Sequence, residues 1–447
     1  PRTCGPNSSK RMSQPDDFSN EDPQLSPPMD LSKWRSLPGK LMLGGAVVTA
    51  LGAILSFKSD HLVNFGFSWL VAFMFCLSLG LGGLFLVLVH HLFDAGWSVA
   101  IRRVNEHLAT LLFPWLALLF IPIAILAPRM FPWMGETLQT TPDHALHAKY
   151  PLFTTAGFYI VTVACFLVWW FLSSSLKKWS LKQDETGAAE CTYKMRFYSY
   201  IGIFLFAFSV TFAAIMWMKA LQHQWFSTMY GVCYFAGSVW LTLGTVYVIT
   251  MVLDRQRILT DVLHEHQYYF LGTLMFAFTV FYAYVTFSQY FIIWNANMPE
   301  ETFYYVVREK GKWFWVSMLI IFGHFFLPFL ALLRIDVKSK FPYMIALVIW
   351  AWLMHFNDMV FQILPAQPNG FSIKWMWLPV GITAMMIGFL ADRFLKAFAS
   401  APPYPLKDPR LVEAMGLYHP VPTQISGGEL DQADRMHGAP ASRKGSH

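Results

Sequence analysis

Residues 66–93, GFSWLVAFMFCLSLGLGGLFLVLVHHLF, contain no Lys, Arg, Asp or Glu, and their two histidines stand near the end. An apolar segment of about 20 residues is long enough to cross the hydrocarbon core of a bilayer, which is about 30 Å thick. This segment is longer than a span requires, so we expect a helix that is tilted or that continues beyond the membrane. The stretch predicts a chain built from membrane-spanning helices.

The composition predicts the same class of protein. Of the 447 residues, 55% are hydrophobic, 17% are aromatic and only 13% are charged, and the mean hydropathy is +0.41. Such values are typical of an all-α polytopic membrane protein. Ten segments are apolar and long enough to span, namely residues 41–57, 66–93, 108–128, 151–176, 197–218, 226–253, 268–294, 313–333, 341–364 and 375–391.

An internal repeat is suggested by two dipeptides. Phe67-Ser68 recurs as Phe226-Ser227, and Glu106-His107 recurs as Glu265-His266, both 159 residues later. Spans two to five and spans six to nine would then start from the same side of the membrane. We therefore expect two parallel four-helix bundles, with spans one and ten added as flanking helices.

The domain organisation and the orientation follow from composition and charge. Residues 1–40 and 397–447 lack apolar periodicity. They are expected to be an N-terminal and a C-terminal tail, which precede and follow a membrane domain at 41–396. With ten spans both termini share one side, and that side holds 25 of the 33 Lys and Arg. Because basic residues stay in the cytoplasm, both termini are expected there, as are the loops near 94–107, 177–196, 254–267 and 334–340. The net charge of +6 reflects this asymmetry and gives no reason to expect nucleic acid as a partner.

The cysteines argue against redox centres held by thiolates. The chain has no C-x-x-C or C-x-x-C-H motif, so iron–sulfur clusters and c-type haem are not expected within it. Three cysteines lie inside spans, where they are expected to be small buried apolar residues. The five are Cys4, Cys76, Cys165, Cys191 and Cys233.

Span nine carries the most informative polar residues, in LMHFNDMVFQILP at 353–365. A carboxylate at a helix centre costs about 2.5 to 3.5 kcal/mol on insertion scales, so Asp358 is expected to face protein or water. His355, Asp358 and Gln362 are spaced i, i+3 and i+7 and share one helix face. A quinol loses two protons when it is oxidised, and a His beside a carboxylate can accept them. His355 and Asp358 are therefore candidates for quinol or proton handling.

Other polar residues extend this hypothesis. Ser288 and Gln289 of span seven are expected at a similar depth and could form a quinone pocket with Gln362. The alternative is a buried polar network that only joins helices.

Four further residues are candidates for a proton path. His90, His91 and Asp94 end span two, and His324 lies near the middle of span eight. Alternatively, the first three reach the membrane interface, and His324 makes a helix-to-helix hydrogen bond. Two inward histidines on separate spans could also bind a b-type haem, but the expected depths of His91, His324 and His355 differ. The sequence therefore predicts no haem or metal site.

Three segments resemble a known family. They are HHLFDAGWSVAIRR at 90–103, QWFSTMYGVCYFAGS at 224–238 and EHQYYFLGTLMFAFTVFYAYVTFSQYFIIWNANMPEET at 265–302. Over residues 40–396 the chain resembles the polysulfide-reductase (NrfD-type) membrane subunits, and within them the ActF-type subunits of bacterial alternative complex III.

The resemblance implies a respiratory complex of the bacterial cytoplasmic (inner) membrane that oxidises quinol or menaquinol and passes electrons to cytochrome c or a terminal oxidase. It implies two four-helix bundles with two flanking helices. Haems and iron–sulfur clusters would reside in partner subunits, which are a multihaem cytochrome c, an iron–sulfur subunit and a second NrfD-type subunit. The chain would contribute a quinone site, a proton path or the membrane anchor, in contact with lipids.

Two other functions fit the same sequence. A secondary transporter also has repeats and a polar cluster near the midplane, but its broken helices usually carry Gly or Pro at matching positions in both halves. Pro122 and Pro328 do not match in this way. The third possibility is a purely structural membrane scaffold for partner subunits.

Overall fold

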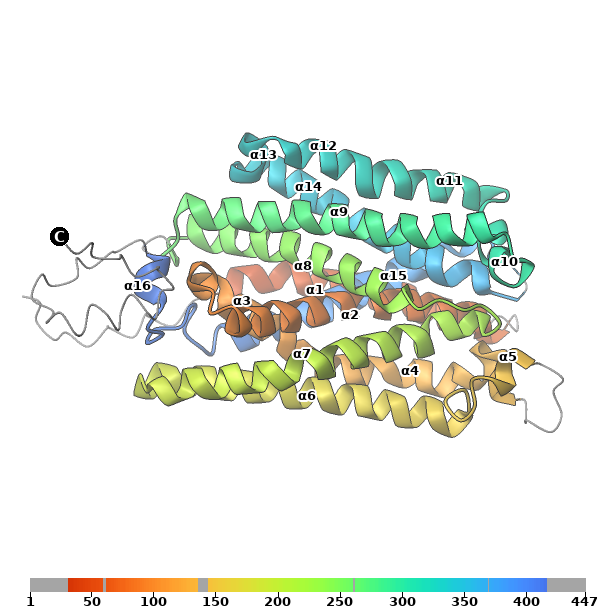
Figure 1. Ribbon diagram of the computed structural model, residues 1–447, viewed down its shortest axis with the longest axis horizontal. Coiled ribbons are helices and arrows are strands. Elements are labelled where there is room, and N and C mark those ends of the chain that lie inside the picture. The colour runs from red at the N-terminus through yellow and green to blue at the C-terminus, as the bar shows by residue number, and fades with distance from the viewer. Residues whose placement is uncertain (1–30, 59–61, 136–143, 260–261, 369, 416–447) are drawn as a thin grey trace, which may run out of the picture.

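The computed structural model describes residues 31–58, 62–135, 144–259, 262–368 and 370–415, and within these ranges the chain forms helices and no strands (Figure 1). Ten helical segments are long and apolar enough to cross a membrane. This confirms the predicted all-α polytopic membrane fold. The spans are α1 (Ser36–Lys58), α2 (Leu62–Leu92), α3 and α4 (Val99–Ala109, Trp115–Met130), α6 (Thr155–Thr186), α7 (Ala189–Trp217), α8 (Tyr230–Arg255), α9 (Glu265–Ala296), α11 and α12 (Lys312–Leu319, Leu327–Leu333), α14 (Phe341–Ile363) and α15 (Trp377–Phe398).

Helices α2 and α8 form the centre of the bundle. They have the largest buried shares of the ten spans, 83% and 78%, and they pack against each other. Gly82 of α2 permits this approach, because a Cβ there would lie 2.1 Å from Oγ1 of Thr242 on α8. Helix α2 also contacts α3, α4, α7 and α15, and α8 also contacts α9; α7 and α14 each contact both central helices. Two groups of four spans thus meet at α2 and α8, and the flanking helices α1 and α15 pack closely on each other.

The repeated dipeptides do not mark equivalent environments. Glu106 and His107 are buried in α3, whereas Glu265 and His266 are exposed in the first turn of α9. Phe67 is fully buried, and Phe226 is 45% exposed. The dipeptides therefore give the expected repeat no structural support.

Two spans are irregular. The third begins at Gly96 with η2 (Gly96–Ser98) and α3, then breaks after η3 (Thr110–Leu112), before Pro114, which has no N–H to donate. The expectation of a loop at 94–107 is therefore wrong, because most of this segment is helix inside the bundle. The eighth span contains a π-helix, η6 (Ile320–Phe326), between α11 and α12. Such segments are rare and often occur at functional sites.

The two ends of the bundle carry different short elements. One end, here the α10 end, holds η4 (Pro132–Gly135), α5 (His144–His147), η5 (Lys219–Gln222), α10 (Pro299–Arg308), η7 (Leu364–Ala366) and η8 (Ile373–Trp375). The other, the α16 end, holds η1 (Ser32–Arg35), α13 (Ile335–Ser339) and α16 (Leu411–Ala414). The start of α1 lies against Gly388 near the end of α15, so both ends of the described chain lie at the α16 end.

Residues 401–415, the C-terminal strap, fold back across the α16 end. Gln267 donates a hydrogen bond of 2.8 Å to the carbonyl oxygen of Ala414, and the backbone N–H of Leu406 donates to Asp184. The part of the C-terminal tail that the structure describes is therefore packed on the bundle. The rest of the expected tail, residues 416–447, lies outside the described residues.

Candidate functional site

The polar stripe of α14 faces the interior of the bundle. His355, Asp358 and Gln362 are 0%, 3% and 9% exposed, as their helical spacing predicts. Nε2 of Gln362 donates a hydrogen bond of 2.9 Å to Oδ2 of Asp358, one helical turn away. The carboxylate is therefore held inside the protein and away from lipid.

His355 is oriented by the central helices. Its Nε2 lies 2.9 Å from Oγ of Ser78 on α2. The Ser78 hydroxyl and the Tyr234 hydroxyl of α8 both donate to the carbonyl oxygen of Met74, over 3.0 and 2.8 Å. With Ser78 donating to Met74, its oxygen accepts from Nε2–H of His355. Nδ1 then holds a lone pair, and it has no hydrogen-bond partner among the described residues.

His324 lies in the π-helix of the eighth span and is enclosed by aromatic rings. Its ring is stacked between Trp240 of α8 and Tyr282 of α9, with centroid distances of 4.2 and 4.1 Å. It is fully buried, and neither ring nitrogen has a hydrogen-bond partner within the described ranges. The expected helix-to-helix hydrogen bond of His324 is therefore not formed.

His324, His355 and Asp358 lie side by side, and we call them the His–Asp cluster. One ligand atom from each lies within 4.8 Å of the others. The expectation that His324 and His355 lie at different depths is therefore wrong, because the axial positions of two helices cannot be read from residue spacing within each one. Two imidazoles and a carboxylate are also a donor set that binds divalent metals. The absence of a metal or haem in this chain stays a prediction.

The α10 end supplies residues that sequence reasoning missed. Arg308 of α10 is 1% exposed and donates to the carbonyl oxygens of Phe361 and Gln362, over 3.2 and 2.9 Å. Its guanidinium lies 3.5 Å from the ring centroid of Tyr304, which stacks on Trp225 at 3.7 Å. Burial raises the pKa of Tyr304, and the charge of Arg308 opposes this rise. The sequence gives no signal for this stack, since Arg308 stands in a charged loop.

Tyrosines connect this end with the cluster. Tyr282 lies close enough to Asp358 to interact with its carboxylate, and Tyr230 interacts with Tyr304. Tyr284, two residues further along α9, is 66% exposed and points away from the core. Phenolic groups therefore extend from Asp358 toward the α10 end.

The expected quinone-pocket residues each make hydrogen bonds of their own. Gln289 accepts a hydrogen bond from Ser227 and donates one to Tyr305, over 2.8 and 2.9 Å. Ser288 donates to the carbonyl oxygen of Val285 in its own helix. Of the three residues, Gln362 forms a hydrogen bond with the His–Asp cluster. Ser288 and Gln289 are occupied by bonds within and between helices.

His90 and His91 belong to a second polar centre at the α16 end. Both are buried, at 3% and 1% exposed, and do not reach the surface as a helix-end role requires. Nδ1 of His90 lies 2.7 Å from Oγ of Ser98, and Arg102 donates to Nε2 of His90 over 3.2 Å. The arginine network that surrounds them consists of Arg102, Arg103, Glu106, Asp184, Asp408 and Arg410.

The C-terminal strap completes the arginine network. Asp408 pairs with Arg102 and Arg410, and Arg410 reaches Asp94 over 2.7 Å. Burial raises the pKa of Asp408, but the hydrogen bonds from Arg410 and the charge of Arg102 outweigh it and hold the pKa well below its usual range. Asp408 therefore remains a carboxylate.

The two polar centres are separate. His90 follows Ser78 by 12 residues on α2, which is about 18 Å along a helix that rises about 1.5 Å per residue. The four expected proton-path residues thus divide, with His324 in the His–Asp cluster and His90, His91 and Asp94 near the arginine network.

The fold and these sites define a polytopic α-helical membrane protein with two buried centres of ionisable residues. No model of a known protein family matches the chain, and no curated protein matches it.

Proposed function

We propose that the chain is the membrane subunit of a bacterial respiratory quinol oxidoreductase, of the NrfD type and similar to the ActF subunit of alternative complex III. It lies in the cytoplasmic membrane with its α16 end toward the cytoplasm. The observation that carries the proposal is the His–Asp cluster, in which His324, His355 and Asp358 meet inside a ten-span bundle. Ionisable residues buried within spans commonly serve proton or ion pathways.

The chemistry requires proton acceptors. Oxidation of a quinol to a quinone releases two electrons and two protons, and the electrons pass to iron–sulfur clusters and haems held by partner subunits. His355 offers Nδ1 as an acceptor, because Ser78 occupies Nε2. Asp358 offers its carboxylate, which Gln362 orients. The tyrosines near Asp358 extend this set toward the α10 end.

Replacement of Asp358 tests the proposal. Asp358→Asn keeps the size and the hydrogen bond from Gln362 but removes titration, so the complex should assemble normally and lose quinol oxidation or its proton coupling. Asp358→Leu leaves Gln362 without its acceptor and should also impair assembly. The exposed Asp336→Asn serves as the control for the loss of one carboxylate. Normal turnover and normal proton coupling in Asp358→Asn would contradict the proposal and leave a structural network.

The scaffold and transporter alternatives are separated from the proposal by purification. A tagged chain isolated in mild detergent should carry a multihaem polypeptide and an iron–sulfur polypeptide with it. A transporter would purify without them. A scaffold would bring them along, yet it would tolerate Asp358→Asn without loss of turnover.

A further inference from the structure

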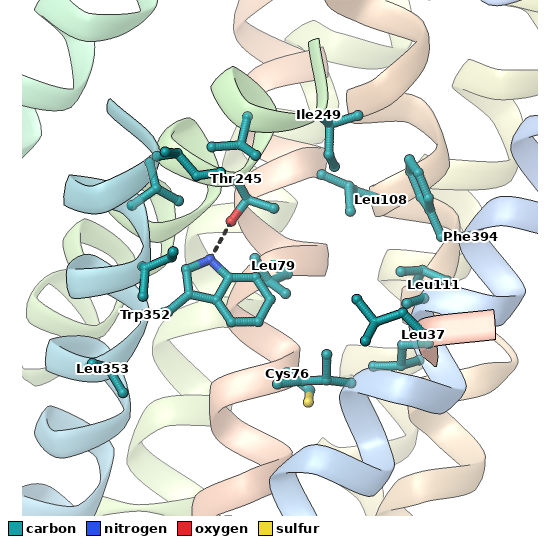
Figure 2. Close-up of a pocket in the computed structure, with 17 residues that line it drawn as sticks. Leu37, Cys76, Leu79, Leu108, Leu111, Thr245, Ile249, Trp352, Leu353 and Phe394 are labelled. Atoms are coloured by element: carbon teal, nitrogen blue, oxygen red, sulfur yellow. Dashed lines mark hydrogen bonds between the residues drawn. The ribbon is translucent and has the colours of Figure 1, made fainter. Parts of the chain in front are cut away.

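A groove on the membrane face of the bundle is not used by the proposed function. It has a volume of about 670 Å³ and lies between α2, α3, α8, α14 and α15, beside the start of α1 (Figure 2). This volume is within the range of about 300 to 1,000 Å³ that ligand pockets occupy. Leu37, Ile349 and Leu353 line it and are 62%, 58% and 55% exposed. The groove therefore opens to the surface that faces lipid.

Apart from the weakly polar thiol of Cys76, the described wall of the groove offers a ligand no free polar group. Almost all its residues are apolar, and the Thr245 hydroxyl donates to the carbonyl oxygen of Leu241 over 2.8 Å. The hydroxyl oxygen of Thr245 in turn accepts from the indole N–H of Trp352 over 2.9 Å, as the dashed line in Figure 2 shows. The part of a ligand that enters the groove must therefore be a hydrocarbon chain.

Basic residues flank the groove on its α16 side, which we call the mouth of the groove. Arg35 precedes α1, Arg255 ends α8 and Lys340 precedes α14, and all three are exposed at the α16 end. The Arg255 guanidinium lies 4.0 Å from the ring centroid of Phe341, one turn before the groove residue Ile345. None of the three cations forms an ion pair with a residue that the structure describes. Basic residues at the membrane surface attract anionic head groups.

We propose that the groove binds one anionic glycerophospholipid from the leaflet at the α16 end. One acyl chain fills the groove, and the phosphate lies near Arg255 and Lys340. The apolar wall selects the chain, and the cations select the head group. The inference does not depend on the quinol chemistry, because it uses none of the residues of the His–Asp cluster.

Native mass spectrometry of the full-length chain in detergent, with phosphatidylglycerol or phosphatidylcholine added, tests the proposal. Wild-type protein should retain one phosphatidylglycerol and prefer it to phosphatidylcholine by about thirtyfold, as expected for two nearby cations. Ala391→Phe fills the groove from α15 and should abolish retention. Ile349→Trp, at an exposed position on α14, is a second groove-filling variant in case the first disturbs folding. Val47→Phe, at a lipid-facing position of α1 that is 54% exposed, is the control and should bind like wild type.

The charge of the mouth is tested separately. The double variant Arg255→Gln and Lys340→Gln should still retain a lipid but lose the preference for phosphatidylglycerol. Equal retention in wild type and in both groove-filling variants would overturn the proposal. So would equal binding of the two lipids to wild type, or extraction of an isoprenoid quinone from the groove in place of a phospholipid.

Discussion

The three side chains of the His–Asp cluster differ in the hydrogen bonds that their polar atoms form. His355 is bonded through Nε2, Asp358 through Oδ2, and His324 through neither nitrogen within the described residues. Buried polar groups without partners are costly. In place of hydrogen bonds, His324 has ring contacts on both faces, from Trp240 and Tyr282. The cluster thus combines two anchored groups with one that is held only by stacking.

The first prediction concerns metal and haem. The missing cysteine motifs predict no thiolate-held metal centre and no c-type haem in the isolated chain, and the donor set of the His–Asp cluster makes a direct test of metal and b-type haem necessary. Optical spectra should show no Soret band, and elemental analysis should find no transition metal above the level found in a His324→Phe variant. Metal present in wild type and lost in that variant would show that the two histidines and Asp358 act as ligands.

Part of this site could be predicted from sequence. The spacing of His355, Asp358 and Gln362 places them on one face of one helix. Burial of Asp358 could be predicted because a carboxylate exposed to lipid costs free energy. The partners on other helices, such as Ser78 and His324, could not be predicted. Their approach depends on how each helix is rotated and shifted against its neighbours, which close packing at residues such as Gly82 decides.

At the scale of elements, the C-terminal strap binds to three separate segments. It reaches Arg102 of α3 through Asp408, Asp184 of α6 through Leu406, and Gln267 of α9 through Ala414. The sequence indicates an irregular tail here, because a strap of this kind has no apolar periodicity. Its packing depends on ion pairs formed with residues distant in the chain. The charged segment 94–107, which contains Arg102, is likewise expected to be a loop. In the structure its arginines are paired with carboxylates inside the bundle.

We predict that Asp408→Asn releases the strap. Loss of one partner from a buried ion pair costs about 3 to 5 kcal/mol, and Arg102 would lose a carboxylate. Hydrogen exchange across residues 401–415 should become faster, while exchange in α2 and α8 stays slow. The exposed Asp336→Asn should leave exchange in the strap unchanged.

The strap should also tolerate mild acid. The pKa of Asp408 is below its usual value of about 3.9. A carboxylate with a lowered pKa stabilises the folded state above its unfolded pKa, and this contribution is lost as the pH falls through the folded value. After correction for the intrinsic pH dependence of amide exchange, the protection of the strap around Asp408 should therefore be the same at about pH 7 and about pH 5. Release of the wild-type strap at about pH 5 would contradict this prediction.

At the scale of the whole molecule, ten spans place both ends of the described chain at one end of the bundle. The basic residues favour a cytoplasmic position for that end, and the α10 end would then face the periplasm. The segment 295–312 is the best place to test this orientation. It is expected in the periplasm, yet it carries three basic residues, Arg308, Lys310 and Lys312. Arg308 is buried against backbone carbonyl groups, so it contributes less to the exposed charge of that side than its place in the sequence indicates.

Cysteine labelling tests this orientation. Asn297 is exposed between α9 and α10, and a membrane-impermeant thiol reagent applied from the periplasm should modify Asn297→Cys. Ala296→Cys is a useful companion, because Asn297 has a positive φ of 49° that other residues adopt less readily. The four native cysteines that the structure describes are buried and should give little background. Labelling only from the cytoplasm would show that the orientation is the reverse of the one proposed.

The strap also sets an order for biogenesis. Asp408 stands 306 residues after Arg102 and follows the last span in the chain, so it is translated after every span has been synthesised. Until then Arg102 lacks one of the two carboxylates that balance it in the finished protein. A chain that terminates early would insert its spans but expose unbalanced arginines at the α16 end.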